Sequence, residues 1–470
     1  MSEASPTAKN AVFLTGSTMR HVIIMTTTSA IGLMSIFFVD AITLFYISQL
    51  GDPSQTAAVG RAAYVLAFII GMSVGFMIGT SAMVARAVGA GRDEAAKSYA
   101  GTSIISVAIF GLLLAGLGFL LLDWLMDMLG ATGEALDYAR TYLYIVLPST
   151  PFFAIGIVTM GILRAHGDAK RSMYITLVGG IMTALLDPFF IFVLGWEVVG
   201  AAVVSAIVRV SFAALGLYFV IGIHKAITVP KFRRYFKDLI DILKIAAPTV
   251  VTNLAAPVGA FLIARAVAEY GDAAVAGQSV VDRLIPLAFG VVFALSGAVG
   301  PIIGQNFGAM QMTRVRQALI DGLIFNCVYI LIAWGLLFIA QEQIIAIYQA
   351  EGRMAIVIRL FCNVLAGSFL FNGMLFVSNA AFNNLGYPLL ATLSNWARQT
   401  LGVIPFIYFG AMWAGLPGII WGASIGAVIF GILPVIGAFW LIQRLTPDSK
   451  TPQETAETPE TPEAAEATVS

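Results

Sequence analysis

Long hydrophobic stretches alternate with short polar ones along almost the entire chain. A membrane-spanning helix needs about 20 predominantly apolar residues in a row. By this rule the sequence predicts twelve spans. They lie at 20–48, 60–85, 98–122, 138–162, 172–194 and 199–223, and then at 245–268, 278–304, 317–340, 355–382, 389–412 and 416–443. The pattern therefore predicts an all-α integral membrane protein.

Composition supports this class and excludes others. Of the 470 residues, 59% are hydrophobic and 11% are charged, with a net charge of zero, whereas a soluble protein carries about 25% charged residues. The lack of a basic block argues against a nucleic-acid partner. The sequence contains no Cys/His cluster with metal-ligand spacing, no phosphate-binding loop and no nucleophile–base pair. We therefore expect a protein that is not an enzyme and has no cofactor.

The distribution of lysine and arginine predicts the orientation in the membrane. Most of these residues lie at the N-terminus and in the loops that follow even-numbered spans. The loops after odd-numbered spans hold only Arg61, Arg140, Arg353 and Arg359. Because basic loops stay in the cytoplasm, we expect a multi-pass protein of the inner (plasma) membrane, with a cytoplasmic N-terminus at 1–19, a cytoplasmic linker at 224–244 and a disordered, acidic cytoplasmic tail at 444–470.

Glycines recur at a nearly constant offset between the two halves. Gly89 matches Gly308 and Gly167 matches Gly386, both at an offset of 219, and Gly51 matches Gly271 at 220. This predicts an N-lobe at 20–223 and a C-lobe at 245–443, each a six-helix bundle. Since each half has an even number of spans, the repeat is parallel. Two such lobes around a central cleft are the geometry of alternating access.

The stretch Thr183-Ala-Leu-Leu-Asp187-Pro188 places an acid inside an apolar segment. An ionised carboxylate at membrane depth costs at least about 3 kcal/mol, so it usually faces a partner or a water-filled cavity. Pro188 has no N–H to donate, which predicts a bent or loosened helix beside the acid.

Three further side chains are expected at the same depth. Asp40 in span 1 and Ser205 in span 6 lie, like Asp187, roughly 9–12 Å below the outer surface, and Thr183 lies one turn from Asp187. We predict an ion-coupling site of Asp40, Asp187, Thr183 and Ser205. It would exchange a proton, or bind Na⁺ through Asp40 and Asp187. The alternative is that each acid only bonds a neighbouring hydroxyl or helix end.

Four other charges are candidates for the substrate pathway. Asp282 and Arg283 in span 8 either line the cleft or pair with each other and with loops. Arg209 and Arg398 lie deep in spans 6 and 11 and contact either an anionic substrate or acidic residues. The second half has no counterpart of the acid pair, so coupling is predicted in the N-lobe.

Taken in order, several short motifs resemble those of the multidrug and toxic compound extrusion (MATE) transporters. They are Leu50-Gly51-Asp52, Ala85-Arg86 with Gly89-Ala-Gly91-Arg92, Leu163-Arg164-Ala-His-Gly167-Asp168, Leu186-Asp187-Pro188, Gly200-Ala-Ala and Gly304-Gln305-Asn306-Phe-Gly308-Ala309. The resemblance covers about residues 18–443. It implies a twelve-helix, two-lobed antiporter that expels organic, often cationic compounds in exchange for H⁺ or Na⁺.

The resemblance also implies roles for particular residues. Asp40, Asp187 and Ser205 match the N-lobe cation site of one branch of the family in residue type, whereas Thr183 stands where that branch has an asparagine. The proline usual in span 1 is missing. These departures bear on the identity of the coupling ion and on the bending of span 1.

Our preferred hypothesis is multidrug efflux driven by H⁺, with Na⁺ as the second possibility. One alternative is a lipid-linked oligosaccharide flippase of the same superfamily, which needs several basic groups in the cleft. Another is a passive channel, against which the repeat and the one-sided acid pair argue. We expect the protein to be a monomer. Its expected partners are a small organic substrate and membrane lipid. The sequence does not identify the substrate.

Overall fold

The computed structural model describes residues 11–130 and 132–446, and these are almost entirely helical. The helices of the first half are α1 (Thr18–Ser48), α2 (Pro53–Gly89), α3 (Asp93–Leu120), α4 (Leu122–Met128), α5 (Glu134–Val146), α6 (Thr150–Ala165), α7 (Ala169–Pro188) and α8 (Glu197–Leu217). Those of the second half are α9 (Phe232–Ala268), α10 (Asp272–Gly308), α11 (Met312–Ile347), α12 (Gly352–Leu360), α13 (Ala366–Leu385), α14 (Pro388–Gln399) and α15 (Ile404–Leu445). The predicted all-α class is confirmed.

Eleven helical segments in the described part of the chain are long and apolar enough to cross a membrane. The last of them, Pro388–Leu445, contains two crossings, because the backbone leaves helical geometry at Ala414 and Gly415. Gly415 has φ +62°, a conformation that favours glycine. The segment therefore turns back on itself, and it accounts for the last two predicted spans.

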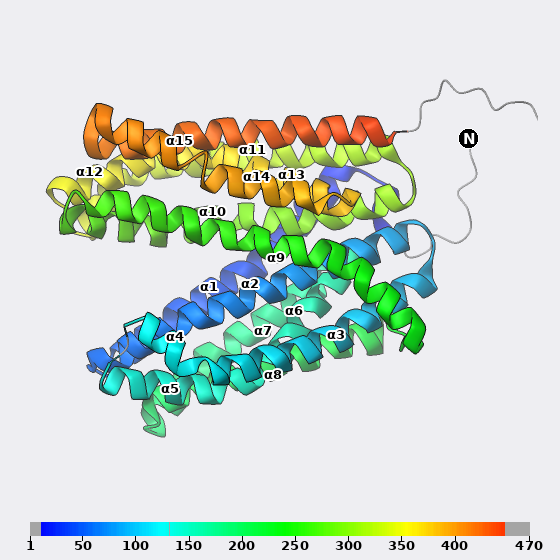
Figure 1. Cartoon of the computed structure of the whole chain (residues 1–470), viewed down its shortest axis with the longest axis horizontal. Helices are drawn as coiled ribbons and strands as arrows, with labels where there is room; N and C mark the ends of the chain where they lie inside the picture. The colour runs from blue at the N-terminus through cyan, green and yellow to red at the C-terminus, as the bar shows by residue number, and fades with distance from the viewer. Residues whose placement is uncertain (1–10, 131, 447–470) are drawn as a thin grey trace, which may run out of the picture.

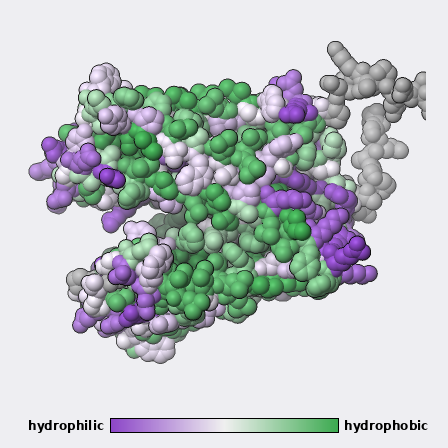
Figure 2. Space-filling model, in the orientation of Figure 1, coloured by the Kyte–Doolittle hydropathy of each residue, from purple (hydrophilic) through white to green (hydrophobic). Residues whose placement is uncertain are grey.

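The helices form two lobes that diverge at one end of the molecule and meet at the other (Figure 1). The first lobe holds α1 to α8 and the second α9 to α15. We call the end with α4, α5 and α12 the open end, where Figure 2 shows a hollow between the lobes. The opposite end, where α1 begins and α15 ends, is the closed end. Hydrophilic residues gather at the two ends, and hydrophobic residues cover the surface between them (Figure 2).

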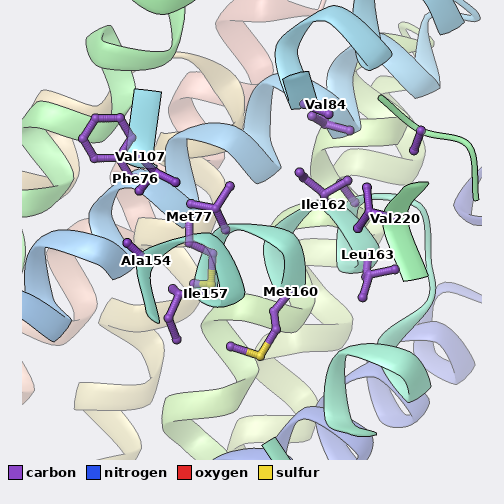
Figure 3. Packing of buried hydrophobic residues seen from close by; sticks show 14 of the residues in the cluster. Phe76, Met77, Val84, Val107, Ala154, Ile157, Met160, Ile162, Leu163 and Val220 are labelled. Atoms are coloured by element: carbon purple, nitrogen blue, oxygen red, sulfur yellow. The ribbon is translucent and has the colours of Figure 1, made fainter. Parts of the chain in front are cut away.

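The helix α6 forms the centre of the first lobe. Figure 3 shows Met77 and Val84 of α2 packed around Ile157, Met160 and Ile162 of α6. In the span Glu134–Ala165, 78% of the most apolar stretch is buried inside the protein, a larger share than in any other described span. The fourth span is thus enclosed by protein, while most of the others face outward along much of their length.

Two predicted boundaries differ from the structure. The fourth span is two helices, α5 and α6, joined by a turn at Leu147–Ser149, because Pro148 and Pro151 supply no N–H for a continuous helix. Residues 232–244, predicted as part of the linker, form the first turns of α9. These turns pack on α3, where Asp238 accepts a hydrogen bond from Ser98. Residues 1–10 and the predicted tail from 447 onward lie outside the described residues.

Candidate functional site

Asp187 lies inside the first lobe and contacts helix α1. Its side chain is 1% exposed. The Oδ2 atom accepts a hydrogen bond of 2.5 Å from Oγ1 of Thr43. The Oδ1 atom is also buried, and it has no hydrogen-bond partner among the described residues. The acid therefore joins α7 to α1 and keeps one oxygen available to a proton or a cation.

Sequence reasoning missed Thr43. The available signal was its spacing, since Thr43 follows Asp40 by three residues and lies on the same face of α1. The backbone of Asp40 is part of α1, but the structure does not describe the Asp40 side chain. The pairing of Asp40 with Asp187 thus stays a prediction.

The helix geometry changes directly after Asp187. Pro188 ends α7, and a π-helical segment, Phe189–Val193, follows it. The wider turn is the loosening that the missing N–H of Pro188 predicted. Gly200 of α8 approaches this segment closely, because a Cβ at that position would lie 2.8 Å from the carbonyl carbon and oxygen of Phe190. The Gly200-Ala-Ala motif thus lets α8 pack against the backbone just beyond the acid.

The two other predicted members of the site bond elsewhere. Thr183 is buried and donates its hydroxyl to the backbone oxygen of Gly179 at 3.1 Å. Ser205 shares a hydrogen bond of 3.2 Å with the hydroxyl of Tyr142. Within the described residues, Asp187 receives its side-chain hydrogen bond from Thr43 and from neither of these groups.

Two of the predicted pathway charges lie on α10, toward the open end. Asp282 and Arg283 are both exposed. Asp282 accepts a hydrogen bond of 2.8 Å from Gln278, one turn earlier. Asp282 and Arg283 form no ion pair with each other among the described residues, because adjacent residues on a helix point in different directions. Their role in the substrate pathway stays a prediction.

The other two candidates are buried inside their lobes. The guanidinium carbon of Arg209 lies 4.9 Å from the centre of the Phe153 ring, a cation–π contact within the first lobe. Arg398 lies on the buried face of α14 that also carries Ala391 and Asn395. The structure thus does not bring the four pathway candidates together into one site.

At the closed end the C-terminal turns of α2 and α10 touch through their backbones. A Cβ on Gly89 would lie 1.9 Å from the carbonyl oxygen of Gln305, and a Cβ on Gly308 would lie 2.1 Å from that of Arg86. Gly89 and Gly308 are repeat partners, as are Arg86 and Gln305. The glycines of these motifs are therefore the residues that allow the two lobes to meet.

Arg86 strengthens this junction from the first lobe. Its Nε donates to the carbonyl oxygen of Asn384 at 2.7 Å and its Nη2 to that of Asn383 at 2.8 Å. Both acceptors lie in the last turn of α13, where the backbone carbonyls lack partners within the helix. The guanidinium thus caps a helix of the opposite lobe.

A short segment near the N-terminus, residues 11–17, also bridges the lobes, and we call it the N-terminal strap. Phe13 in the strap is 1% exposed. Its backbone N–H donates to Oε1 of Gln305 at 3.0 Å, and its carbonyl accepts from Arg314 at 2.8 Å. Gln305 in turn donates to the carbonyl of Ala165 in the first lobe at 2.7 Å. The strap and Gln305 thus close the seam between the lobes at this end.

A charged cluster fixes the turn between α6 and α7 at the same end. Asp168 caps α7 by accepting from the backbone N–H of Arg171 at 3.0 Å, and it also accepts from Nε2 of His224 at 2.8 Å. Burial alone raises the pKa of the Asp168 carboxyl, but the hydrogen bonds from His224 and Arg171 hold that pKa well below its usual range. The carboxylate therefore stays charged and ties this turn to the end of the sixth span.

The chain is similar over most of its length to known transporters. It is 26% identical over 413 residues to the multidrug export protein MepA of Staphylococcus haemolyticus, covering 87% of this chain and 90% of that protein. It is also 26% identical over 430 residues to the FAD transporter of Shewanella oneidensis, covering 90% and 93%. A solved structure of a MATE multidrug resistance transporter in an outward-facing conformation superimposes with a TM-score of 0.87, at 22% identity, over 94% of this chain and 99% of that chain.

The family comparison also supports the internal repeat. The MatE family matches residues 28–189 and again residues 248–409. Both ends of the two matched segments differ by 220 positions, close to the offsets of the glycine landmarks. The two lobes are therefore two copies of one structural unit, and the chain belongs to the MatE family of transporters.

Proposed function

We propose that this protein is a secondary active antiporter that exports organic, mainly cationic compounds in exchange for H⁺, with Na⁺ as the second candidate ion. The observation that carries this proposal is Asp187, a buried acid with one oxygen bonded to Thr43 and the other without a partner among the described residues. Acids at membrane depth are costly and mark ion pathways. The similarity to MepA supports multidrug export.

The proposed orientation places the closed end in the cytoplasm. The basic loops that predicted a cytoplasmic location include Arg86, Arg164 and Arg314, and these lie at the closed end. The described conformation would then be outward-open. Binding of an ion at Asp187 would change the contact between α7 and α1 and release substrate toward the outside.

The two candidate ions make different demands on the site. A proton needs only a carboxylate oxygen that is free of a hydrogen bond, and Oδ1 of Asp187 has no partner among the described residues. Na⁺ needs several oxygen ligands. The first lobe offers those of Asp187 and Thr43, and further ones from Asp40 and Ser205 if these side chains turn toward the ion. No resident cofactor is proposed.

Transport of a fluorescent cationic dye in proteoliposomes tests the proposal, with a pH gradient and a Na⁺ gradient imposed separately. We expect the pH gradient alone to drive dye movement. Asp187→Asn should abolish this dye movement, because an asparagine amide neither gains nor loses a proton near neutral pH. The control is Asp123→Asn, which removes an exposed acid at the open end that pairs with Arg140.

The outcomes of this assay distinguish the coupling ion and the alternative functions. Movement with Na⁺ alone would assign Na⁺ coupling. Normal ion-driven transport in Asp187→Asn would exclude the proposed site. Dye flux without any gradient would indicate the channel, and absence of movement under both gradients would favour the flippase.

A second candidate function is export of an anionic dinucleotide, as in the relative named FAD transporter. The structural observation that favours it is the basic, buried Arg398 in the second lobe. Competition between the cationic dye and FAD in the same proteoliposomes distinguishes the two substrate classes.

A further inference from the structure

Arg398 is a buried cation without a counter-charge. Its side chain is 6% exposed. Its Nε and Nη1 atoms are enclosed and have no hydrogen-bond partner among the described residues, and none of the described acids forms an ion pair with it. Arg86, which is also largely buried, satisfies its guanidinium on two carbonyl oxygens. Arg398 therefore differs from an arginine that serves only to join helices.

The residue also lies deep within its span. It follows Pro388, the first residue of α14, by ten positions, or roughly 15 Å along the helix axis. The same span continues beyond it for sixteen positions, or about 24 Å of helix, to the turn at Ala414. An ionisable side chain at this depth is costly unless it meets a partner, and its natural role is in a functional site.

The backbone next to Arg398 is interrupted. Regular helix ends at Gln399, and a turn at residues 400–403 precedes α15, which begins at Ile404. In this turn the N–H of Gly402 donates to the carbonyl oxygen of Ala397, five residues earlier instead of four. Broken helices at membrane depth occur where the backbone is buried in protein or lines a binding site.

The fifth and eleventh spans carry buried charges of opposite sign. Asp187 lies in the fifth span and Arg398 in the eleventh, which is the repeat partner of the fifth. The position that corresponds to Arg398 in the first lobe is Gly179 at the offset of 219. The fifth span thus carries a buried acid and its repeat partner, the eleventh span, a buried base.

We propose that Arg398 and the break between α14 and α15 form a binding site for an anionic group. The ligand is a carboxylate or phosphate group, carried either by a transported solute or by a free inorganic anion. Such a group would accept a hydrogen bond from the unpartnered Nε or Nη1 atom and would compensate the charge of the guanidinium. The role of the bound group in export rests on the proposed function, whereas its binding does not.

Equilibrium binding of three flavins to the purified full-length protein tests the site without any gradient. Riboflavin has no phosphate, FMN has one phosphate group and FAD has a diphosphate, while the fluorescent ring is the same. We expect FMN and FAD to bind about tenfold or more tightly than riboflavin, which is the size of one charge-assisted contact. Failure of the dye-transport assay would leave this result unaffected, so the two proposals fail separately.

Three variants separate binding from folding. Arg398→Gln should remove the preference for phosphate, and Arg398→Lys should retain part of it. Arg359→Gln, which removes an exposed arginine paired with Glu342, should leave it unchanged. Because the unliganded site holds an uncompensated charge, Arg398→Gln should melt at the same temperature as the original protein or higher. A lower melting temperature that Arg398→Lys restores would mean a structural role and overturn the proposal.

The source of the anion is decided by a separate measurement. Inorganic phosphate, compared with chloride at equal ionic strength, should raise the melting temperature of the original protein but not of Arg398→Gln if the ligand is a free anion. A preference for FMN over riboflavin without this effect assigns the anionic group to a solute. The absence of both effects would overturn the proposal.

Discussion

Thr43 shows how much a single hydroxyl contributes to the candidate ion site. Among the described residues, Thr43 is the side chain that donates a hydrogen bond to the buried Asp187 carboxylate, and it lies on a different helix from the acid. Hydrogen bonds to charged groups contribute about 1.5–3 kcal/mol, and a buried charge that loses its donor is left with its full desolvation cost. Its loss should therefore affect both the ion site and the contact between α1 and α7.

We expect Thr43→Val to reduce ion-driven dye transport by tenfold or more while the protein still inserts. Valine keeps the shape of threonine but cannot donate to Asp187. The measurement is initial transport rate in proteoliposomes at equal protein density. Thr27→Val is the matched control, because Thr27 lies on the same helix and donates only to backbone oxygens of α1. Equal transport in the two variants would remove Thr43 from the site.

At the scale of elements, the crossing of α2 and α10 depends on two glycines. Gly89 and Gly308 each lie where a Cβ would collide with the backbone of the other helix, at 1.9 Å and 2.1 Å. A clash with backbone cannot be relieved by a change of rotamer. Any larger residue must therefore separate the helices, and with them the lobes at the closed end.

Gly89→Val is expected to lower the melting temperature and to open the closed end. Overpacking of a tight contact costs about 1–3 kcal/mol, and here the strain is relieved when α2 moves away from α10. Thermal unfolding and the distance between spin labels at Lys170 and Arg316, on the two lobes, measure the two effects. Gly116→Val serves as the control, since a Cβ at Gly116 meets nothing within 4 Å. If both variants behave alike, the crossing does not hold the lobes together.

At the scale of the whole molecule, the described conformation is held closed at one end by contacts between segments far apart in sequence. The N-terminal strap, Gln305 and Arg86 connect the start of the chain, the end of α10 and the end of α13. In the proposed alternating-access cycle these contacts would break and the hollow at the open end would close. The strap would then stabilise one of the two proposed states.

Phe13→Ala should shift the protein toward the state in which the closed end is open. Removal of the buried ring should weaken the packing of the strap against the two lobes by roughly 3–5 kcal/mol of free energy. Spin labels at Lys170 and Arg316, on the two lobes, should report longer distances in this variant, with Cys327 and Cys362 replaced by serine. Val12→Ala, which shortens an exposed neighbour in the strap, is the control. An unchanged distance distribution in Phe13→Ala would show that the strap does not govern the equilibrium.

Much of the architecture follows from local sequence patterns. A run of about 20 apolar residues must form a helix in a membrane, because its backbone groups find no other hydrogen-bond partners there. For this reason the spans, the internal repeat and the loosened helix after Pro188 were predicted correctly. The broken fourth span was missed, although Pro148 and Pro151 stood in it, because hydrophobicity alone does not distinguish one helix from two.

The partners of each polar side chain were decided only by the tertiary structure. Depth along a span indicated that Asp187, Thr183 and Ser205 lie at similar levels, but the rotation of each helix about its axis sets which way a side chain points. That rotation depends on packing between helices, as at the Gly200 contact. It directs Thr43 toward Asp187, Ser205 toward Tyr142 and Arg398 into the interior of its lobe. The sequence by itself thus determined a two-lobed membrane transporter with a buried acid, and tertiary packing decided which residues surround that acid.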